Sequence, residues 1–355
     1  MTMLEHLQLQ PAQPQDGYFM ELALAQAHKG AFTARPNPAV GCVIVKDGQI
    51  IGVGFHPKAG APHAEIFALN DARQQGHDVV GATVYVTLEP CSHVGKTPPC
   101  SDALIDAKVK RVVVACFDSN PKVAGKGILK LVGAGIAVSV GVCEPQAKKL
   151  NVGFFKAMTT NLPYVRLKVA CSLDGRTAMQ SGESKWITGV KAREDVQKLR
   201  AKSGAIITGS GTILADNPAL SVRSAMLGVD SSQVPAPKIV VVDRRQRLTN
   251  TDDYQVFDCP DTLLWHQELP LLLQTLATKY QCYDVLVEAG SKLSGAFVAN
   301  NLVDELIVYQ APCVLGVAAL PLFDVHIEQL AWQKRFELLD VCRLGNDLKL
   351  VFVPK

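Results

Sequence analysis

The sequence predicts an α/β protein made of two domains. Along most of the 355 residues, short runs rich in β-branched residues alternate with segments of helical periodicity, a pattern typical of sheets covered by helices. A chain of this length can also bury two hydrophobic cores. Residues 159–163 contain Thr, Asn and Pro and indicate a linker. With residues 1–16 expected to form a disordered tail, the predicted domains are residues 17–160 and 161–355.

The first half shows a regular order of elements. Asp47-Gly48 separates two apolar runs and predicts a hairpin turn, and Pro62 just before a periodic segment predicts a helix start. The expected elements are a helix over residues 18–29, strands over 42–45 and 50–54, a helix over 63–75, a strand over 83–88, a helix over 101–107, a strand over 111–116, a helix over 128–133, a strand over 137–142 and a helix over 145–156. This alternation predicts a sheet between layers of helices.

The second half alternates in the same way. The expected elements are strands over residues 164–170, 205–208, 238–243, 285–288 and 305–309, and a charged helix over 191–202. Glycine-rich turns follow two of these strands, at 209–212 and 289–295, and such turns present backbone N–H groups to phosphates. Neither turn matches the Gly-x-Gly-x-x-Gly fingerprint, and helix capping explains such turns equally well. The sequence therefore excludes a Rossmann fingerprint but is compatible with a dinucleotide site of another kind.

Composition and charge exclude several classes of protein. Lys and Arg total 15 against 12 Asp and Glu in residues 1–160, and 21 against 21 afterwards, so neither half has the basic surface of a nucleic-acid-binding domain. The longest apolar stretch, near residues 131–143, is too short to span a membrane. The start of the chain shows no signal-peptide pattern. These features predict a cytoplasmic globular protein without nucleic-acid or membrane partners.

Two of the ten cysteines stand apart from the others. Four lie in apolar, strand-like runs and are expected to be buried thiols, whereas Cys91 and Cys100 have polar, Pro-rich surroundings. Together with His63 they make the ligand set of a zinc site with one open position. Nucleobase deaminases carry His-x-Glu followed by Pro-Cys-x-x-Cys, but here eight residues separate Cys91 from Cys100. The pattern therefore predicts a metal site with an inserted loop.

The metal site is predicted to be catalytic. Glu65 follows the ligand His63 closely and has the carboxylate that passes a proton from an activated water to a leaving amine. A structural zinc with His93 as fourth ligand is the alternative. Each ligand lies at or just before an expected helix start, where the helix dipole favours a thiolate. His93 and Lys96 in the inserted loop suit an anionic group such as phosphate, although a solvated polar loop explains them too.

Both halves resemble one enzyme family. The first half resembles the deaminase part of the bifunctional deaminase/reductase of riboflavin biosynthesis at Asn37-Pro38, His63-Ala64-Glu65, Thr87-Leu88-Glu89-Pro90-Cys91-Ser92-His93 and Lys96-Thr97-Pro98-Pro99-Cys100. In that family the long gap between the two cysteines is expected. The second half resembles the reductase part at Lys168, Ser172-Leu173-Asp174-Gly175, Ser181-Gly182-Glu183-Ser184, Trp186-Ile187-Thr188, Thr212, Asp216-Asn217-Pro218 and Glu288-Ala289-Gly290. The two matches cover nearly the whole chain after residue 16.

The resemblance implies a fold and a reaction for each half. The N-terminal half is expected to be a cytidine-deaminase-like α/β/α sandwich that binds Zn²⁺, and the C-terminal half a dihydrofolate-reductase-like α/β domain that uses NADPH. Hydrolytic deamination of 2,5-diamino-6-(ribosylamino)-pyrimidinone 5'-phosphate would precede reduction of its ribosyl group to ribityl. The expected partner is therefore a small phosphorylated pyrimidine. The family also indicates a homo-oligomer of at least two chains.

Site residues follow from the motif and from the resemblance. The metal ligands are His63, Cys91 and Cys100, and Glu65 is the catalytic residue. Cofactor contacts are expected at Ala170, Trp186, Thr212, Asp216, Gly290, Ser291, Lys292, Leu293, Ser294, Gly295 and Ala296. Substrate contacts are expected at Asn37, His93, Lys96, Lys168, Ser184, Arg200, Leu220, Arg223 and Glu288. Lys168, Asp216 and Glu288 have the polar character to orient or protonate the imine, and the residues alone leave them unranked.

Some features admit other interpretations. Arg244 and Arg245 follow an expected strand and could meet the 2'-phosphate that distinguishes NADPH from NADH, and a solvated surface pair explains them equally well. An RNA-editing deaminase would need a basic face that residues 161–355 lack. A non-enzymatic binding protein with a structural zinc would need four protein ligands.

Overall fold

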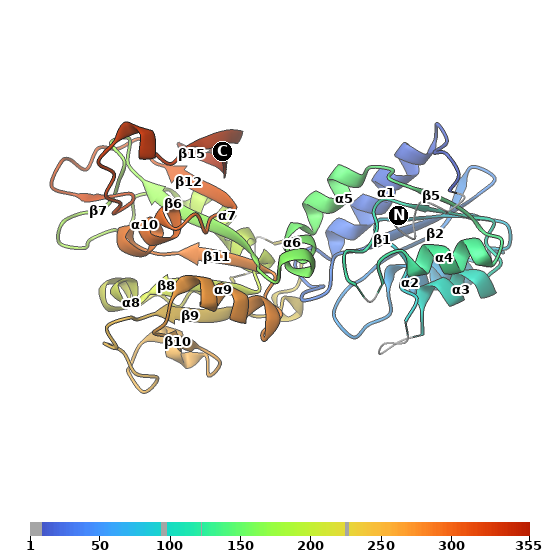
Figure 1. The fold of residues 1–355 in the computed structure, drawn as a ribbon, viewed down its shortest axis with the longest axis horizontal. Helices are drawn as coiled ribbons and strands as arrows, with labels where there is room; N and C mark the ends of the chain where they lie inside the picture. The colour runs from blue at the N-terminus through green and yellow to red at the C-terminus, as the bar shows by residue number, and fades with distance from the viewer. Residues whose placement is uncertain (1–8, 94–97, 122, 224–226) are drawn as a thin grey trace. The chain divides into compact units, whose positions relative to one another are not determined.

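The computed structural model describes residues 9–93, 98–121, 123–223 and 227–355 (Figure 1). Residues 1–8, the first part of the predicted tail, lie outside these ranges. The chain divides into two compact units, Met1–Thr160 and Asn161–Lys355. Each unit contains a β-sheet with helices on both faces, so the α/β class predicted from the sequence is confirmed. None of the described helices is long and apolar enough to cross a membrane.

The first unit is built on a five-stranded sheet in the order β2-β1-β3-β4-β5. β1 pairs antiparallel with β2 and with β3, whereas β3, β4 and β5 are parallel. The strands are β1 (Gly41–Lys46), β2 (Gln49–Phe55), β3 (Thr83–Val86), β4 (Arg111–Val114) and β5 (Ala137–Val140). The helices are α1 (Asp16–Lys29), α2 (Ala64–Gln74), α3 (Cys100–Asp106), α4 (Lys126–Gly133), α5 (Glu144–Leu150) and α6 (Val152–Thr160).

One helix differs from the sequence-based expectation. The single helix predicted over residues 145–156 is divided at Asn151 into α5 and α6. The side chain of Asn151 forms two hydrogen bonds with the backbone of Ala39, at 2.8 and 2.9 Å. This long-range contact holds Asn151 at the junction between the two helices. The break could not be predicted from helical periodicity, because periodicity depends only on residues close together in the chain. The linker predicted at 159–163 begins inside α6, which ends at Thr160.

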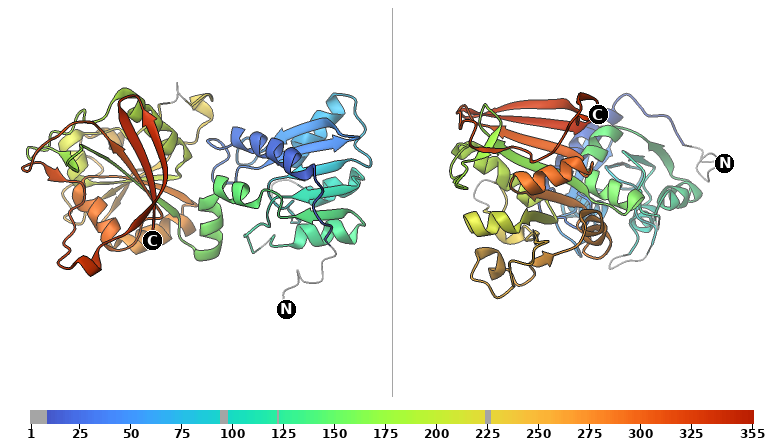
Figure 2. Two further views of the ribbon diagram at one scale, coloured as in Figure 1. Left: turned by 90° about the horizontal axis from the view of Figure 1, so that it is seen from above. Right: turned by 60° about the vertical axis from the view of Figure 1, so that its left-hand side comes forward.

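Helices cover both faces of the first sheet (Figures 1 and 2). Ile44 of β1 packs in one core with residues of α2, α3 and α4. Phe19 of α1 meets Tyr85 of β3 on the opposite face, with ring centroids 5.2 Å apart. Gly54 lets α2 lie directly on β2, because a Cβ there would be 2.3 Å from the carbonyl oxygen of Ala64. Since Ala64 begins α2, this close contact positions the end of the helix that follows the predicted ligand His63.

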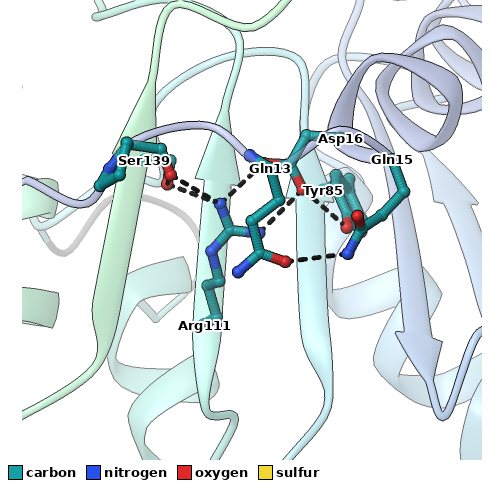
Figure 3. Close-up of polar contacts among 7 residues, drawn as sticks. Gln13, Gln15, Asp16, Tyr85, Arg111 and Ser139 are labelled. Atoms are coloured by element: carbon teal, nitrogen blue, oxygen red, sulfur yellow. Dashed lines mark hydrogen bonds and ion pairs between the residues drawn. The ribbon is translucent and has the colours of Figure 1, made fainter.

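The segment before α1 lies against the sheet (Figure 3). The carboxylate of Asp16 is fully buried and accepts two hydrogen bonds from Arg111, at 2.8 and 2.7 Å. Tyr85 donates another to Asp16 at 3.0 Å, and Arg111 also donates to the carbonyl oxygen of Pro11 at 3.5 Å. Burial alone would raise the pKa of Asp16, but its hydrogen bonds, that from Arg111 foremost, lower it overall. The prediction of a disordered tail is therefore wrong for residues 9–16.

Arg111→Met is expected to lower the free energy of unfolding of the first unit by about 3–5 kcal/mol, because Asp16 would stay buried without its partner. All three tryptophans follow residue 161, so tryptophan fluorescence reports on the second unit alone, whereas far-UV circular dichroism reports on both. Urea melts should therefore show an early transition in the dichroism only. Gln15→Ala, at an exposed neighbouring position, is the control. Identical melts for the two variants would contradict a stabilising role of the pair.

The second unit is built on an eight-stranded sheet in the order β10-β9-β8-β11-β6-β12-β15-β14. Neighbouring strands are parallel from β10 to β12, whereas β15 and β14 join antiparallel. The strands of this sheet are β6 (Tyr164–Cys171), β8 (Ala205–Gly209), β9 (Lys238–Val242), β10 (Leu263–Trp265), β11 (Asp284–Glu288), β12 (Glu305–Gln310), β14 (Phe336–Leu344) and β15 (Asp347–Pro354). Two short strands, β7 (Arg176–Ala178) and β13 (Leu320–Pro321), form a separate antiparallel pair. The helices are α7 (Val190–Lys202), α8 (Ser210–Asp216), α9 (Leu269–Thr278) and α10 (Ser291–Ala299), with 3₁₀ turns at Ser231–Gln233, Gln255–Asp258 and Leu330–Trp332.

The two faces of this sheet carry different helices (Figures 1 and 2). Leu167 and Val287 pack with α9 and α10, whereas Ile206 and Leu286 pack with α7 and α8. The parallel strands bring their carboxyl ends to one edge of the sheet, where ligands collect in α/β proteins. The hairpin β14–β15 is not among the elements predicted from the sequence. β14 is exposed along most of its length, so it lacks the alternation of a half-buried strand.

Candidate active sites

Two sulfurs and one imidazole nitrogen meet in the first unit. The Nδ1 atom of His63 lies 3.2 Å from the Sγ atom of Cys100 and 3.5 Å from that of Cys91. The three ligand atoms all lie within 4.8 Å of one another. These are ligand types that zinc prefers, and three protein ligands leave a fourth position open. The structure thus brings the predicted metal ligands together, and their chemistry fits zinc.

The local chain path holds the two sulfurs at helix and strand ends. His63 directly precedes α2, Cys91 lies in the turn after β3, and Cys100 is the first residue of α3. The backbone N–H of Cys100 donates a hydrogen bond to the Sγ atom of Cys91 at 3.3 Å. Hydrogen bonds with the Cys100 side chain and with His63 lower the pKa of Cys91. This environment favours the thiolate, which is the form that binds a metal.

Glu65 lies beside these ligands without belonging to the three-ligand group. It is in the first turn of α2, two residues after His63, and only 3% of it is exposed. Burial raises the pKa of Glu65 to about 7, and its side chain also hydrogen-bonds with Cys100. A carboxyl group in this position can take up and release a proton next to the metal ligands.

Asn37 acts on the site through a histidine that the sequence analysis does not single out. The amide Nδ2 of Asn37 lies 3.0 Å from Nε2 of His56, and Nδ1 of His56 lies 3.0 Å from the carbonyl oxygen of Pro62. Burial lowers the pKa of His56 and favours the neutral ring, so Nδ1–H donates to Pro62 and Nε2 accepts from Asn37. The rings of His56 and His63 meet edge-on, with centroids 5.3 Å apart. The pair therefore packs against a metal ligand.

Glu89 belongs to the motif around Cys91 but was not predicted as a site residue. Its buried carboxylate accepts hydrogen bonds from the backbone N–H groups of Asp118 (3.2 Å), Gly125 (2.9 Å) and Gly127 (2.9 Å). A Cβ at Gly127 would lie 1.9 Å from the carbonyl oxygen of Pro90, so only glycine fits. Burial raises the pKa of Asp118 to about 6. Glu89 thus fixes the segment after β4 beside the turn after β3, and its place just before Pro90 was the signal available in the sequence.

The loop between the two cysteines contributes one described candidate. His93 is exposed and is not part of the three-ligand group. The predicted substrate contact Lys96 lies outside the described residues, as do the other residues of 94–97. Within the described ranges no fourth side chain joins the three ligands, so the alternative of a four-ligand structural zinc gains no support.

In the second unit, three predicted substrate contacts form one polar cluster. Glu288, at the end of β11, accepts hydrogen bonds from Arg200 of α7 at 2.6 and 3.0 Å. Lys168 of β6 is the register partner of Glu288, and its Nζ atom lies 3.7 Å from the carboxylate. Burial lowers the pKa of Lys168, and Glu288 opposes this effect. The cluster therefore holds two cations against one carboxylate in a largely buried place.

Ser184 and Asp216, a predicted substrate contact and a predicted cofactor contact, are hydrogen-bonded. The hydroxyl of Ser184 lies 3.3 Å from each carboxylate oxygen of Asp216. The next residue, Lys185, donates to the carbonyl oxygen of Asp216 at 2.8 Å. Trp186 is 70% exposed, and the guanidinium of Arg193 lies 4.5 Å from its ring centroid. The segment 184–186 thus lies along the end of α8.

Leu220 and Arg223 lie in the segment that follows α8, and this segment contacts α7. Arg200 donates to the carbonyl oxygen of Ser221 at 3.1 Å, and the backbone N–H of Arg223 donates to Gln197 at 2.8 Å. The side chain of Leu220 is buried in the core around α7. A ligand contact at Leu220 would therefore use its backbone.

The two glycine-rich turns lie side by side, because they follow the neighbouring parallel strands β8 and β11. A Cβ at Gly290 would lie 3.8 Å from the hydroxyl of Thr212, and one at Gly209 would lie 3.6 Å from the side chain of Leu293. The side chains of Thr212 and Leu293 therefore lie next to these two glycines. Backbone N–H groups at the start of α10 face phosphates in such an arrangement. The turns therefore fit the pyrophosphate of a dinucleotide such as NADPH.

The remaining predicted cofactor contacts divide into two groups. Ser294 donates to the carbonyl oxygen of Ala289 at 3.1 Å, and a Cβ at Gly295 would lie 2.4 Å from the carbonyl oxygen of Asp324, so both residues serve local packing. Ala170 is in β6, two residues after Lys168, and Ser291, Lys292 and Ala296 are in α10.

Comparisons with known proteins agree with both sites. The cytidine and deoxycytidylate deaminase zinc-binding region matches residues 13–116, and the RibD C-terminal domain matches residues 163–350. The riboflavin biosynthesis protein RibD of Escherichia coli (strain K12) is 46% identical and covers 96% of this chain and 99% of its own length. The solved structure of Acinetobacter baumannii RibD is 53% identical with a TM-score of 0.89. That of a diaminohydroxyphosphoribosylaminopyrimidine deaminase/5-amino-6-(5-phosphoribosylamino)uracil reductase from Thermotoga maritima is 34% identical with a TM-score of 0.88, and each structure covers 96% of this chain and 99% of its own.

These matches confirm several predictions made from the sequence. The first domain is deaminase-like, the second is dihydrofolate-reductase-like, and the cofactors are Zn²⁺ and NADPH. The similarity runs through both units, since each relative covers nearly the whole chain. The chain belongs to the RibD family of riboflavin biosynthesis proteins, bifunctional enzymes that join a zinc-binding deaminase domain to a reductase domain.

Proposed function

We propose that the first unit deaminates 2,5-diamino-6-(ribosylamino)-pyrimidinone 5'-phosphate and that the second unit then reduces the ribosyl group to ribityl. The observation that carries this proposal is the buried Glu65 beside His63, Cys91 and Cys100, the arrangement of a hydrolytic zinc site. The Thermotoga maritima relative, whose name combines a pyrimidine deaminase with a uracil reductase, supports the same pair of reactions. The domain limits of 17–160 and 161–355 belong to this proposal.

In the first unit, residues of the chain bind the 5'-phosphate and move the proton. Zinc held by His63, Cys91 and Cys100 supplies Lewis-acid activation of water. The carboxylate of Glu65 accepts a proton from the attacking water and donates it to the amine as that group leaves. Lys96 and His93 bind the 5'-phosphate through their positive or hydrogen-bonding groups.

In the second unit, the cluster of Lys168, Arg200 and Glu288 supplies the proton that accompanies hydride transfer. NADPH supplies the hydride that reduces the open-chain imine at the first carbon of the sugar. Lys168 donates a proton to the imine nitrogen, so that the nitrogen and the carbon each gain one hydrogen. Glu288, held by Arg200, keeps the Lys168 side chain in place. We favour Lys168 over Asp216 as the donor, because the carboxylate of Asp216 already accepts a hydrogen bond from Ser184.

The test is a two-signal assay on the purified chain with the phosphorylated pyrimidine as substrate. Ammonia release follows the first reaction, and the loss of NADPH absorbance follows the second. We expect ammonia without NADPH present, and NADPH oxidation only after ammonia has been released. NADPH oxidation with no release of ammonia would contradict the proposed order of the two steps.

A second copy of the chain is the proposed protein partner, in the cytoplasm, and it binds at β14. This nine-residue strand is the outer strand of the sheet. Leu338, Leu339 and Val341 in it are 52%, 58% and 51% exposed, and Leu330 and Trp332 just before it are 81% and 56% exposed. An apolar edge strand pairs readily with another chain, and natural proteins cover such edges. A second copy would bury these side chains.

Leu339→Asp is expected to convert the protein to a monomer of 38.2 kDa, because a charge placed in the edge would be desolvated on pairing. Sedimentation velocity at micromolar concentration measures the mass. Leu271→Asp is the matched control, since Leu271 is 45% exposed on α9 rather than at the edge strand. A wild-type protein that sediments as a monomer would contradict the proposal that a second copy is the partner. An oligomer that persists in Leu339→Asp would contradict the proposal that the copies bind through β14.

A further inference from the structure

The cation that recognises the 2'-phosphate of NADPH can be assigned from the segment after β9. We infer that Arg247, rather than Arg244 or Arg245, binds this phosphate and so selects NADPH over NADH. The inference rests on the proposed reductase function of the second unit. It names a specificity residue for the cofactor.

The order of the strands sets the direction of the cofactor. Lys168 of β6 and Glu288 of β11 mark the place where the sugar is reduced, so the nicotinamide must lie near these two strands. The glycine-rich turn after β11 begins directly after Glu288, and the turn after β8 lies one strand farther from β6. The rest of the cofactor therefore runs past β8 toward β9. Strand spacing of about 4.8 Å puts β9 about 10 Å from β11, at the adenosine end of the molecule.

Arg247 is held in position at this end. Its Nη2 donates a hydrogen bond to the hydroxyl of Ser210 at 2.7 Å, and its Nε lies 3.7 Å from the buried carboxylate of Asp243. A Cβ at Gly211 would lie 3.9 Å from the same Nη2, so the guanidinium reaches back across the turn after β8. The side chain is 41% exposed, and within the described residues its Nη1 has no hydrogen-bond partner. A fixed guanidinium thus presents unused N–H groups to the solvent.

The two neighbouring arginines are less suited to this role. Arg244 pairs with Glu268 at 2.8 Å, and both side chains are largely exposed, at 65% and 71%. The negative charge of Glu268 would oppose a phosphate at Arg244. Arg245 is exposed and has no ion pair among the described residues, so binding would cost the rotamer entropy of a free side chain. Arg247 avoids the entropic cost because Ser210 and Asp243 already hold it. The carboxylate beside Arg247, that of Asp243, is buried, whereas the carboxylate of Glu268 beside Arg244 is exposed.

Direct binding measurements test the assignment independently of turnover. Isothermal titration of the full chain with NADPH, NADH, 2',5'-ADP and 5'-AMP gives a dissociation constant for each ligand. We expect Arg247→Ala to weaken NADPH and 2',5'-ADP by about 10- to 100-fold, the loss of a charge-assisted hydrogen bond, and to leave NADH and 5'-AMP unchanged. Arg247→Lys should show a smaller loss, because lysine keeps the charge without the planar fork. Arg244→Ala and Arg245→Ala should bind all four ligands as the wild type does.

The outcomes separate this inference from the function on which it rests. Equal weakening of NADPH and NADH in Arg247→Ala, or a selective loss in Arg244→Ala or Arg245→Ala, would overturn the assignment while leaving the reductase function intact. A wild-type chain that binds neither dinucleotide would overturn the reductase function and the assignment with it. Tryptophan fluorescence reports whether the second unit of each variant is folded. If Arg247→Ala does not fold, Arg247→Lys must show a smaller loss of affinity that is still selective for NADPH and 2',5'-ADP.

Discussion

Glu65→Gln is expected to slow ammonia release by about 10²- to 10⁴-fold, because an amide cannot accept the proton of the attacking water or return it to the leaving amine. Glutamine has nearly the same shape, and the three metal ligands are untouched, so zinc content should stay at one per chain. NADPH oxidation on substrate that has already been deaminated should continue at the wild-type rate. Stopped assays measure ammonia release, and metal analysis of the same sample measures the zinc content.

Glu21→Gln makes the same chemical change at an exposed position on α1 and is the control. It should retain both activities. A variant at Glu65 that loses zinc together with ammonia release would assign this residue to the metal shell instead of to proton transfer. Parallel loss of the two activities would contradict two separate sites.

Lys168→Met is expected to give the complementary result. Reduction should fall by about 10²- to 10⁴-fold because the proton donor is gone, whereas ammonia release should be unchanged. The variant should fold, since Glu288 keeps its two hydrogen bonds from Arg200. Single-turnover loss of NADPH absorbance, started with deaminated substrate, measures the step.

The lowered pKa of Lys168 adds a test of its role. A lysine donates its proton only below its pKa, and burial places this pKa under the usual value of about 10.4. Reduction in the wild type should therefore decline as the pH rises through that lowered value. Lys198→Met, at an exposed position of α7, is the control and should keep the wild-type rate and profile. Full reduction by Lys168→Met would assign the proton to another donor.

Residue types and local spacing were sufficient to predict the metal site. His63 and Glu65 are two residues apart at a helix start, and Cys91 and Cys100 lie at a strand end and a helix start, so short stretches of chain create most of the geometry. The alternation of strands and helices was equally local, because hydrophobic periodicity reports which face of each element is buried. Gly345-Asn346 between β14 and β15 was a turn signal that could have revealed the last hairpin.

Contacts between distant residues were not predictable in this way. Asp16 accepts hydrogen bonds from Arg111, and Glu89 accepts one from the backbone N–H of Gly127. No local pattern indicates that either carboxylate meets its distant partner. The predicted pair Arg244 and Arg245 illustrates the limit most directly. Composition indicated cations after β9, but the hydrogen bond between Arg247 and Ser210, 37 residues apart, is what distinguishes one arginine from its neighbours.

The sequence by itself determined the α/β class and the family, and it predicted His63, Cys91 and Cys100 as a group with Glu65 close by. Each of these depends on residue chemistry and on spacing within a turn or a strand. Only the tertiary structure decided that the N-terminal segment is anchored, that Lys168 and Arg200 share Glu288, and that Arg247 is held by Ser210 and Asp243. These features depend on which strands become neighbours, because that order brings together side chains that lie far apart along the chain.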